Sequence, residues 1–373
     1  VLVASRDIDD LEDWELSSLT GSVFQNPRTQ FFNLDTTGEI AFGMENLGVP
    51  RKEMHRRVRD VVRELGIECL MGRGIFELSG GQMQSVAFAS AWACKPSVYV
   101  LDEPSSNLDP PSMEKLASFI SKAKSSGSAV IIAEHRLSYL ASVADRYLLF
   151  EGGSVAAEWD AQRFLGLSDA ERESCGLRSS EPPKLADLMQ RLSRPASAFP
   201  AVEARGIYAG YERGVPVLEG ITVSFDPGRV VGVVGRNGAG KSTLLKCLAG
   251  IKKEELGHVR FQGSVVPPKR RPNHAFLVMQ DPDYQLFRPS VRDELASAAP
   301  SPSDVDELRL EAVLEEFGLG GVADRHPASL SGGQKQRCVC AIASESGAQA
   351  LLLDEPTSGL DYRECMTVML SLI

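Results

Sequence analysis

A glycine-rich segment followed by lysine and serine is the clearest chemical signal in the sequence. It runs from Gly235 to Thr243 and fits the pattern G-x-x-x-x-G-K-[ST]. Glycines let backbone N–H groups surround phosphate oxygens, Lys241 can reach the β- and γ-phosphates, and Ser242 offers a hydroxyl to Mg²⁺. The alternative is a plain glycine turn before a helix. The pattern favours an ATP and Mg²⁺ site made by Gly235, Asn237, Gly238, Ala239, Gly240, Lys241, Ser242 and Thr243.

Two pairs of neighbouring carboxylates form a second signal. Asp354 and Glu355 follow one apolar run, and Asp102 and Glu103 follow another. The first carboxylate of such a pair can hold Mg²⁺ through water, and the second can polarise the attacking water. A single Asp-Glu pair is usually a solvated surface feature, but this pair occurs twice in the same context. We therefore predict that Asp354 and Asp102 are metal ligands and that Glu355 and Glu103 are catalytic.

Two glutamines and one histidine stand where they can complete these sites. Gln280 follows the strand-like run 276–279, and Gln25 has similar surroundings near the beginning of the chain. An amide at a strand end can ligate Mg²⁺ and orient water, so both are predicted to be catalytic and metal-binding. His135 follows the apolar run 129–133 and can contact a γ-phosphate, although a lone histidine is more often structural.

An aromatic residue precedes the glycine-rich loop. Tyr211 lies 24 residues before Gly235 (235 − 211) and can stack on an adenine ring. Tyr208 is a rival for this role, and a tyrosine buried in the core is the alternative to both. We predict Tyr211 as the adenine contact.

The sequence contains one unit twice. Three segments recur with the offset 252 (331 − 79, 354 − 102, 361 − 109), and the glutamines recur with the offset 255 (280 − 25). Common offsets over such a length indicate duplication of a whole domain rather than a short solenoid repeat. The recurring segments are Leu78-Ser79-Gly80-Gly81-Gln82 with Leu330-Ser331-Gly332-Gly333-Gln334, Leu101-Asp102-Glu103-Pro104 with Leu353-Asp354-Glu355-Pro356, and Leu108-Asp109 with Leu360-Asp361.

The two copies are expected to be incomplete at opposite ends. Lys241 stands 39 residues before Gln280 (280 − 241), but only 24 residues precede Gln25 in the first copy. His135 follows Asp109 by 26 residues (135 − 109), and the same step in the second copy passes the last residue. The expected domains are therefore 1–165, with its phosphate loop missing, and 201–373, with its C-terminal part missing. A Pro- and Ser-rich linker is expected at 166–200, with a short helix at 184–192.

Hydrophobic patterning gives the expected fold class, which is α/β. Strands that alternate with helices imply a mainly parallel sheet, and such sheets bind ligands beyond their carboxyl ends. A helical subdomain is expected in each core, before each Ser-Gly-Gly-Gln segment. Strands are predicted at 98–101, 129–133, 230–234 and 350–353, of which 129–133 and 230–234 are expected to be buried. Helices are predicted at 51–65, 242–248 and 304–317.

Composition narrows the classes of function. The net charge of −10 argues against a nucleic-acid binder, which usually carries a basic stripe. The short cluster Lys269–Arg271 is read as a solvated loop. No apolar run reaches the roughly 20 residues that a membrane span needs. The seven cysteines are odd in number and match no zinc or disulfide spacing, so we expect buried thiols in a reduced, cytoplasmic protein.

Taken in order, the phosphate loop, the glutamine, Leu-Ser-Gly-Gly-Gln, Asp-Glu-Pro, Leu-Asp and the histidine resemble the ABC ATPase family over nearly the whole chain outside the linker. The resemblance implies two P-loop ABC-type ATPase domains that pair head to tail and hydrolyse ATP with Mg²⁺. Each ATP would contact the phosphate loop of one domain and the signature of the other. The signature residues are then predicted to bind nucleotide: Ser79, Gly80, Gly81, Gln82, Ser331, Gly332, Gly333 and Gln334. One departure is Ser85, where the family usually has arginine, as at Arg337; we expect slightly weaker anchoring of that helix.

A narrower resemblance lies in the segments after each glutamine. Gln25-Asn26-Pro27-Arg28-Thr29-Gln30-Phe31-Phe32 and Gln280-Asp281-Pro282-Asp283-Tyr284-Gln285-Leu286-Phe287 are similar to the energy-coupling factor importers of vitamins or transition-metal ions. So are Glu39-Ile40-Ala41-Phe42-Gly43 and Ala133-Glu134-His135-Arg136-Leu137. This resemblance implies a transmembrane coupling protein and a substrate-binding membrane protein as partners, and a peripheral location at the cytoplasmic face of the cell membrane.

Four apolar side chains in these segments, Phe31, Phe32, Leu286 and Phe287, suggest a docking groove for the membrane partner. The alternative is that they pack under the helical subdomain. Two other classes of function stay open: a soluble tandem ABC ATPase that acts on ribosomes or nucleic-acid repair, and an inactive binding module. Both Asp-Glu pairs and both signatures argue against the inactive module.

Overall fold

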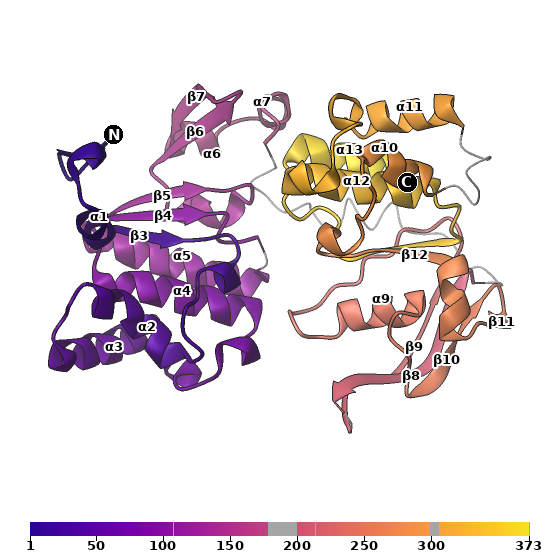
Figure 1. Ribbon diagram of the computed structural model, residues 1–373, viewed down its shortest axis with the longest axis horizontal. Helices are drawn as coiled ribbons and strands as arrows, with labels where there is room; N and C mark the ends of the chain where they lie inside the picture. The colour runs from indigo at the N-terminus through magenta and orange to yellow at the C-terminus, as the bar shows by residue number, and fades with distance from the viewer. Residues whose placement is uncertain (107, 178–199, 213, 299–305, 373) are drawn as a thin grey trace. The chain divides into compact units, whose positions relative to one another are not determined.

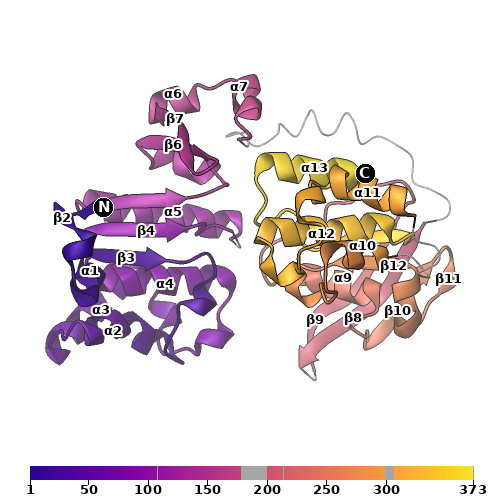
Figure 2. The same ribbon diagram turned by 45° about the horizontal axis from the view of Figure 1, so that its top comes forward.

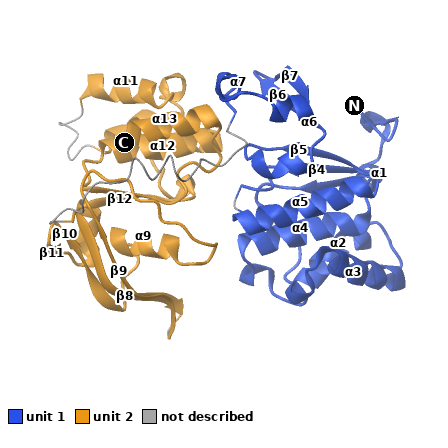
Figure 3. Cartoon of the chain, turned by 180° about the vertical axis from the view of Figure 1, so that it is seen from behind, with its two compact units in different colours: residues 1–182 blue, residues 183–373 orange. Residues whose placement is uncertain are grey.

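The computed structural model describes residues 1–106, 108–177, 200–212, 214–298 and 306–372. The chain divides into two compact units, Val1–Pro182 and Pro183–Ile373, and each is described by itself (Figure 3). The expected linker begins within a short helix region of unit 1, where α7 spans Asp169–Ser174. The rest of that linker, with the helix predicted at 184–192, lies outside the described residues.

Unit 1 consists of a parallel sheet, helices along it and two short hairpins (Figure 1). Its strands are β1 (Leu2–Val3), β2 (Arg6–Asp7), β3 (Thr20–Val23), β4 (Val98–Asp102), β5 (Ala129–Ala133), β6 (Arg146–Glu151) and β7 (Ser154–Asp160). Its helices are α1 (Asp13–Leu19), α2 (Thr36–Asn46), α3 (Arg51–Leu65), α4 (Gly80–Cys94), α5 (Pro110–Ser125), α6 (Ala161–Leu165) and α7. The strands predicted at 98–101 and 129–133 and the helix predicted at 51–65 are confirmed.

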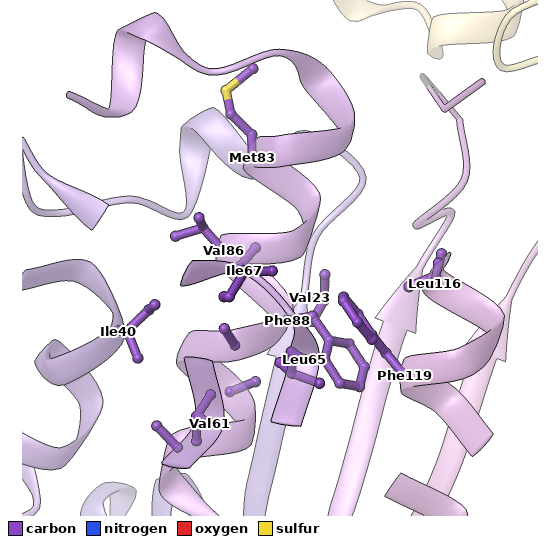
Figure 4. Close-up of a cluster of buried hydrophobic side chains, with 14 of the residues drawn as sticks. Val23, Ile40, Val61, Leu65, Ile67, Met83, Val86, Phe88, Leu116 and Phe119 are labelled. Atoms are coloured by element: carbon purple, nitrogen blue, oxygen red, sulfur yellow. The ribbon is translucent and has the colours of Figure 1, made fainter. Parts of the chain in front are cut away.

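The central sheet of unit 1 has the order β3-β4-β5, and all of its pairs are parallel. Figure 2 shows α4 and α5 lying along these strands. The core between them is aromatic: the ring of Phe88 on α4 lies 5.6 Å from Tyr99 on β4 and 5.3 Å from Phe119 on α5. Aliphatic side chains from α2, α3 and β3 complete this cluster (Figure 4). This packing fixes the ends of β3, β4 and β5 side by side.

The other face of this sheet is open within the described residues of unit 1. Ile131 on β5 is 60% exposed and Val100 on β4 is 41% exposed. The prediction that 129–133 is a buried strand is therefore right about the strand and wrong about its burial. The run is apolar at every position, and such a run does not reveal which faces are covered.

The described residues of unit 2 form two separate sheets. The strands β8 (Val202–Glu212), β9 (Val215–Phe225), β10 (Leu256–Phe261) and β11 (Ser264–Val265) form an antiparallel sheet in the order β11-β10-β8-β9. The strands β12 (Ala275–Val278) and β13 (Ala350–Leu353) form a parallel pair. The helices are α9 (Lys241–Ala249), α10 (Val291–Ala296), α11 (Glu307–Glu316), α12 (Gly332–Glu345) and α13 (Tyr362–Leu372). The sequence predicted the parallel pair and α9 but not the antiparallel sheet.

The strand predicted at 230–234 is wrong. This segment has no regular secondary structure, and Val234 is 91% exposed. A strand is stable only when a neighbour pairs with its backbone groups, and no described strand pairs with this segment. The β-branched residues that suggested a strand report local preference alone.

The two units differ in what covers the parallel strands. Leu352 on β13 is the counterpart of Val100 (352 − 100 = 252) and is only 8% exposed. It packs in one cluster with Leu244, Leu245 and Leu248 of α9. The helix that begins at the phosphate loop therefore packs on β13, and the loop lies near the strand end that Asp354 follows.

The repeated Leu-Asp pairs are helix caps. Asp109 accepts a hydrogen bond from the backbone N–H of Ser112 at 3.1 Å as α5 begins, and Asp361 accepts one from Glu364 at 2.8 Å as α13 begins. A capping carboxylate satisfies a free N–H of the first turn. The conformation of this segment is thus set locally in both copies.

The basic cluster 269–271 and the cysteines differ in part from what the sequence predicts. Lys269 and Arg270 are exposed as expected, but Arg271 is 1% exposed, so the solvated-loop reading is wrong for that residue. All seven cysteines are free thiols, but the expectation that they are buried holds only for Cys247, Cys338 and Cys340. Cys69 is exposed, and the other three are half-buried. No helix in the described residues has the length and apolar character of a membrane span.

Candidate functional site

The glycine-rich loop connects β9 to α9, and its glycines have conformations that other residues avoid. Gly238 and Gly240 have φ of 81° and 93°. A Cβ atom on Gly240 would lie 2.8 Å from the Leu218 side chain on β9, so only glycine fits there. Lys241 Nζ donates to the carbonyl oxygens of Gly235 at 2.9 Å and Arg236 at 3.0 Å. The loop therefore already curls around an ammonium group at the start of a helix.

The serine after this lysine meets the first carboxylate of the second Asp-Glu pair. Ser242 Oγ donates to Asp354 Oδ1 at 2.9 Å, and Asp354 is only 8% exposed. A hydroxyl beside a shielded carboxylate is a set of hard oxygen donors that suits Mg²⁺. The residues present therefore fit the ion, and Ser242 and Asp354 are the candidates to hold it. Thr243, the next residue, lies in the first turn of α9 and is buried.

The neighbouring glutamate and the predicted glutamine are also brought together. Gln280 Nε2 donates to Glu355 Oε2 at 3.3 Å. The two residues follow β12 and β13, whose parallel pairing places their carboxyl ends at one edge. Glu355 has φ of 52°, a left-handed conformation that costs a non-glycine residue about 1–2 kcal/mol. Such strain gathers at functional sites.

Unit 1 brings two predicted residues, Gln25 and His135, to the carboxylate of a third, Glu103. Gln25 Nε2 donates to Glu103 Oε2 at 2.9 Å, and His135 Nε2 lies 3.1 Å from Glu103 Oε1. Glu103 also has a left-handed backbone, with φ of 39°. Asp102, by contrast, is exposed at the end of β4. The structure thus places Gln25, Glu103 and His135 together at the edge formed by β3, β4 and β5.

The carboxylate of Glu134 orders the turn that contains His135. Glu134 Oε1 accepts hydrogen bonds from the backbone N–H groups of His135 at 2.8 Å and Arg136 at 2.9 Å. Glu134 Oε2 accepts a third from the Tyr139 hydroxyl at 2.8 Å, and burial, with this carboxylate nearby, raises the pKa of Tyr139 far above its usual value. Arg136 donates to the carbonyl of Leu108 at 3.1 Å. The only signal in the sequence was the motif Ala133-Glu134-His135-Arg136-Leu137, which contains Glu134 and Arg136 but not Tyr139.

Both Ser-Gly-Gly-Gln segments begin a helix with a reciprocal cap. Ser79 N–H donates to Gln82 Oε1 at 3.0 Å, and Gln82 N–H donates to Ser79 Oγ at 3.4 Å. Ser331 and Gln334 repeat these bonds at 3.0 and 3.3 Å. The serine and glutamine therefore have a structural role within each unit. The two glycines between them present backbone N–H groups at the helix start, which is a place where anions bind.

Tyr211 is an exposed residue near the phosphate loop. It is 62% exposed on β8, so the alternative of a core tyrosine is excluded. The loop residue Gly240 packs against β9 at Leu218, which pairs with Ala209 two residues before Tyr211. Lys252 Nζ lies 4.9 Å from the centre of the Tyr211 ring. Tyr208, the rival, is 38% exposed on the same strand.

The arginine that Ser85 replaces has a clear role in unit 2. Arg337 Nη1 donates to the carbonyl of Phe317 at 3.2 Å, and Nη2 pairs with Glu364 at 3.1 Å. These contacts tie α12 to the end of α11 and to α13. Ser85 only donates to the carbonyl of Gly81 within α4, at 2.9 Å. The signature helix of unit 1 therefore lacks this link, as the sequence predicted.

A phosphate loop that begins a helix beside an Asp-Glu pair at the end of a parallel strand defines a P-loop ATPase. The pattern of the ABC transporter family matches residues 1–106 and 218–358. The chain belongs to the ABC transporter family, whose ATPase domains bind and hydrolyse ATP.

Two relatives agree with this family. A protein of Treponema denticola, named as an ABC transporter ATP-binding protein, is 41% identical over 94% of this chain and 71% of its own length. A Bacillus subtilis protein, named as an HMP/thiamine import ATP-binding protein, is 32% identical over 99% of this chain and 72% of its own length.

A solved structure titled RNase-L Inhibitor has a TM-score of 0.62 and 24% identity, over 94% of this chain. This chain spans 65% of the length of that one. At this identity the similarity shows a shared fold alone.

Proposed function

We propose that the chain is the ATP-hydrolysing motor of an energy-coupling-factor importer for vitamins or transition-metal ions. The observation that carries the proposal is the segment after Gln25 and after Gln280, which presents an exposed phenylalanine in both copies. Phe32 is 75% exposed and Phe287 is 78% exposed. Large apolar side chains exposed at equivalent positions favour contact with another protein. The import function in the name of the Bacillus subtilis relative supports the same proposal.

The four apolar residues suggested as a docking groove are of two kinds. Phe31 and Leu286 are partly buried and pack against the cores of their units, as the alternative held. Phe32 and Phe287 are exposed, and the ring of Phe32 stacks on Phe42 of α2 at 4.8 Å. The docking proposal therefore rests on Phe32 and Phe287.

The proposed partners are a transmembrane coupling protein and a substrate-binding membrane protein. An apolar helix face of the coupling protein would take Phe32 and Phe287 as anchors, in the manner of a helix in a groove. The chain would then act as a peripheral protein at the cytoplasmic face of the membrane. The membrane proteins would select the substrate, as the resemblance to the importer family implies.

The proposed chemistry of unit 2 begins with phosphate binding. The backbone N–H groups of 235–243 and the ammonium of Lys241 hold the β- and γ-phosphates, and Tyr211 stacks on adenine. Mg²⁺, held by Ser242 and Asp354, neutralises phosphate charge when bound. Glu355 polarises the attacking water, and the amide of Gln280 keeps that carboxylate in place. Removal of the carboxylate would leave binding but lower the rate of the chemical step.

In unit 1 the same proposed roles fall on Gln25, Asp102 and Glu103, with His135 as a contact to the γ-phosphate. The pairing of the two domains, with each signature serving the other domain's nucleotide, is part of this proposal. It is supported by the family resemblance and by the repeat of the glutamine, Ser-Gly-Gly-Gln and Asp-Glu motifs.

Co-purification from native membranes tests the proposed function. The full-length protein, extracted in mild detergent, should carry with it at least one polytopic membrane protein in stoichiometric amount, and vesicles that contain the complex should import substrate only with ATP. Sedimentation with ribosomes, and no membrane protein in the purified complex, would instead support the alternative of a soluble tandem ATPase.

A further inference from the structure

We propose that a second glutamine in each copy, Gln30 and Gln285, is a positioning residue for ATP hydrolysis. Each follows the first glutamine by five residues (30 − 25 and 285 − 280). Each holds the backbone from which the first glutamine reaches the candidate catalytic glutamate. The inference rests on the roles proposed above for Gln25 and Gln280.

In unit 1 the side chain of Gln30 folds back onto the end of β3. Its Nε2 donates to the carbonyl of Ser22 at 2.9 Å, and its Oε1 accepts from the backbone N–H of Phe24 at 3.0 Å. A donor and an acceptor on alternate residues are what a neighbouring strand would supply. β3 is an edge strand in its described sheet. The side-chain amide of Gln30 therefore takes the place of a neighbouring strand for the backbone groups of Ser22 and Phe24. Phe24 directly precedes Gln25.

Unit 2 repeats the arrangement with different surrounding residues. Gln285 Nε2 donates to the carbonyl of Leu277 at 2.7 Å, and its Oε1 accepts from the N–H of Met279 at 2.7 Å. Met279 directly precedes Gln280. The intervening residues form a single 3-10 turn in both copies, Pro27–Thr29 and Pro282–Tyr284. Four equivalent hydrogen bonds at one offset indicate a built feature rather than a chance contact.

We call the two hydrogen bonds from each second glutamine to the backbone a clamp. The position of the first glutamine depends on this clamp. The N–H groups of Phe24 and Met279 lie one residue before the glutamines whose side chains contact Glu103 and Glu355. Fixing these peptide groups restricts the direction in which each glutamine side chain leaves the strand end. The amide then meets a carboxylate whose own backbone is held in a left-handed conformation. Both partners of the contact are therefore preorganised.

The other end of the same loop is also tied down. Glu39 on α2 is 2% exposed, and its Oε2 accepts from the N–H groups of Phe32 at 3.0 Å and Asn33 at 2.9 Å. Glu294 on α10, 3% exposed, accepts from the N–H groups of Phe287 and Arg288. In each copy a glutamine side chain therefore holds the end of the loop next to the strand, and a glutamate side chain holds the end next to the exposed phenylalanine. Gln30 and Gln285 are the clamps on the catalytic side.

If Gln30 and Gln285 only stabilised the loop, replacing them would lower the stability of the protein but leave kcat unchanged. The discriminating experiment compares the paired change Gln30→Met and Gln285→Met with the full-length wild-type protein. Methionine keeps the length of the side chain and removes both hydrogen bonds. We expect kcat for ATP to fall about tenfold while KM and the Kd for MgATP change less than about twofold. An unchanged kcat would overturn the proposal.

The matched control lies in the same turn. Thr29 Oγ1 donates only to the carbonyl of Asn26, at 2.8 Å, so Thr29→Val with Tyr284→Phe perturbs the turn but leaves the clamps. This pair should keep kcat within about twofold of wild type. An equal loss of kcat in the control would assign the effect to the turn as a whole and overturn the specific role of the glutamines.

A double-mutant cycle tests whether the second glutamine acts through the first. Gln25→Ala with Gln280→Ala should lower kcat, and adding the two methionines should lower it no further, because the clamped side chain is already gone. Additive losses would overturn the proposal. If the alanine pair alone leaves kcat unchanged, the proposed role of Gln25 and Gln280 fails, which is a separate result.

A second variant covers the case in which the methionine protein does not fold. Glutamate at 30 and 285 keeps an acceptor at neutral pH and regains a donor when it is protonated. The kcat of Gln30→Glu with Gln285→Glu, relative to wild type, should rise as the pH falls. A ratio that stays flat with pH would overturn the positioning role.

Discussion

The hydroxyl of Ser242 donates a hydrogen bond to Oδ1 of Asp354 across 2.9 Å, although 112 residues separate them. The contact joins the first turn of α9 to the end of β13 and places the phosphate loop beside the carboxylates of unit 2. Asp354 is largely shielded from solvent, so the hydrogen bond to Ser242 is protected from competition with water. The position of Lys241, one residue earlier, follows from the same contact.

We expect Lys241→Ala to weaken ATP binding at this site about 10- to 100-fold, because a hydrogen bond to a charged group contributes about 1.5–3 kcal/mol. Titration of the full-length protein with a fluorescent ATP analogue measures the change. Lys246→Ala, on the same helix but outside the loop, is the matched control and should bind ATP like wild type. Equal affinity of the two variants would show that the loop does not hold the phosphates.

Glu355→Gln should keep ATP binding and abolish most turnover. The amide retains the shape of the side chain but cannot polarise water, so we expect the rate to fall at least about 100-fold, or about 2.7 kcal/mol in activation free energy. Steady-state phosphate release and trapped nucleotide measure both effects. Turnover within about twofold of wild type would exclude Glu355 as the general base.

The backbone of Glu355 allows a prediction about stability. With φ of 52°, glycine should fit this position better than alanine by about 1 kcal/mol. We therefore expect Glu355→Gly to unfold at higher denaturant concentration than Glu355→Ala, while both lack hydrolysis. The comparison uses two inactive variants, so activity does not influence it. A more stable alanine variant would contradict the proposed strain.

Much of this site could be predicted because its residues follow strands. Gln280 and Glu355 are each the second residue after their strands, β12 and β13, and parallel pairing brings such strand ends together. The role of Glu134 could not be predicted, because its three hydrogen bonds depend on the turn around His135. Sequence alone shows the residue but not the conformation that aims it.

The failures in the fold have a common physical cause. The run 230–234 has strong β-propensity, yet a strand needs a paired neighbour, which local sequence does not reveal. Arg271 was predicted to belong to a solvated basic cluster, but Glu254, 17 residues earlier and only 10% exposed, pairs with it. The split of the four apolar loop residues into exposed and packed pairs likewise depends on tertiary contacts.

Arg271 allows a further prediction. Its guanidinium makes two hydrogen bonds to Glu254, and donates to the carbonyls of Val266 and Cys247. Removing one partner of a buried ion pair costs about 3–5 kcal/mol, so Arg271→Ala should lower the stability of unit 2 by about that amount. Chemical denaturation of the full-length protein measures it. Lys269→Ala, exposed two residues earlier, is the control and should change stability by less than about 0.5 kcal/mol.

The same pair predicts a pH dependence. Burial alone would raise the pKa of Glu254, but the hydrogen bonds and charge of Arg271 outweigh it and hold the pKa below its usual 4.5. A group whose pKa is lowered on folding stabilises the protein above the unfolded value and loses that contribution as the pH falls through the folded value. Wild-type stability should therefore fall below about pH 4.5 more steeply than that of Glu254→Gln. Equal slopes would contradict the pairing.

The last prediction concerns coupling to the membrane. Phe32→Ser with Phe287→Ser should leave ATP affinity unchanged, because both rings are exposed. Neither ring belongs to the phosphate loop or to an Asp-Glu pair. The same change removes two proposed apolar anchors, so partner retention in detergent should fall and hydrolysis should continue without import. Nucleotide titration and co-purification on the full-length protein measure the two effects in parallel.

The matched control for this pair is Phe31→Ser with Leu286→Ser, the packed neighbours in the same loops. Because these side chains contribute to the two cores, the control should destabilise the protein by about 1–3 kcal/mol, whether or not a partner is present. If Phe32→Ser with Phe287→Ser also unfolds the protein, the exposed rings serve the fold rather than docking. If that pair keeps its membrane partner and imports normally, the anchors lie elsewhere.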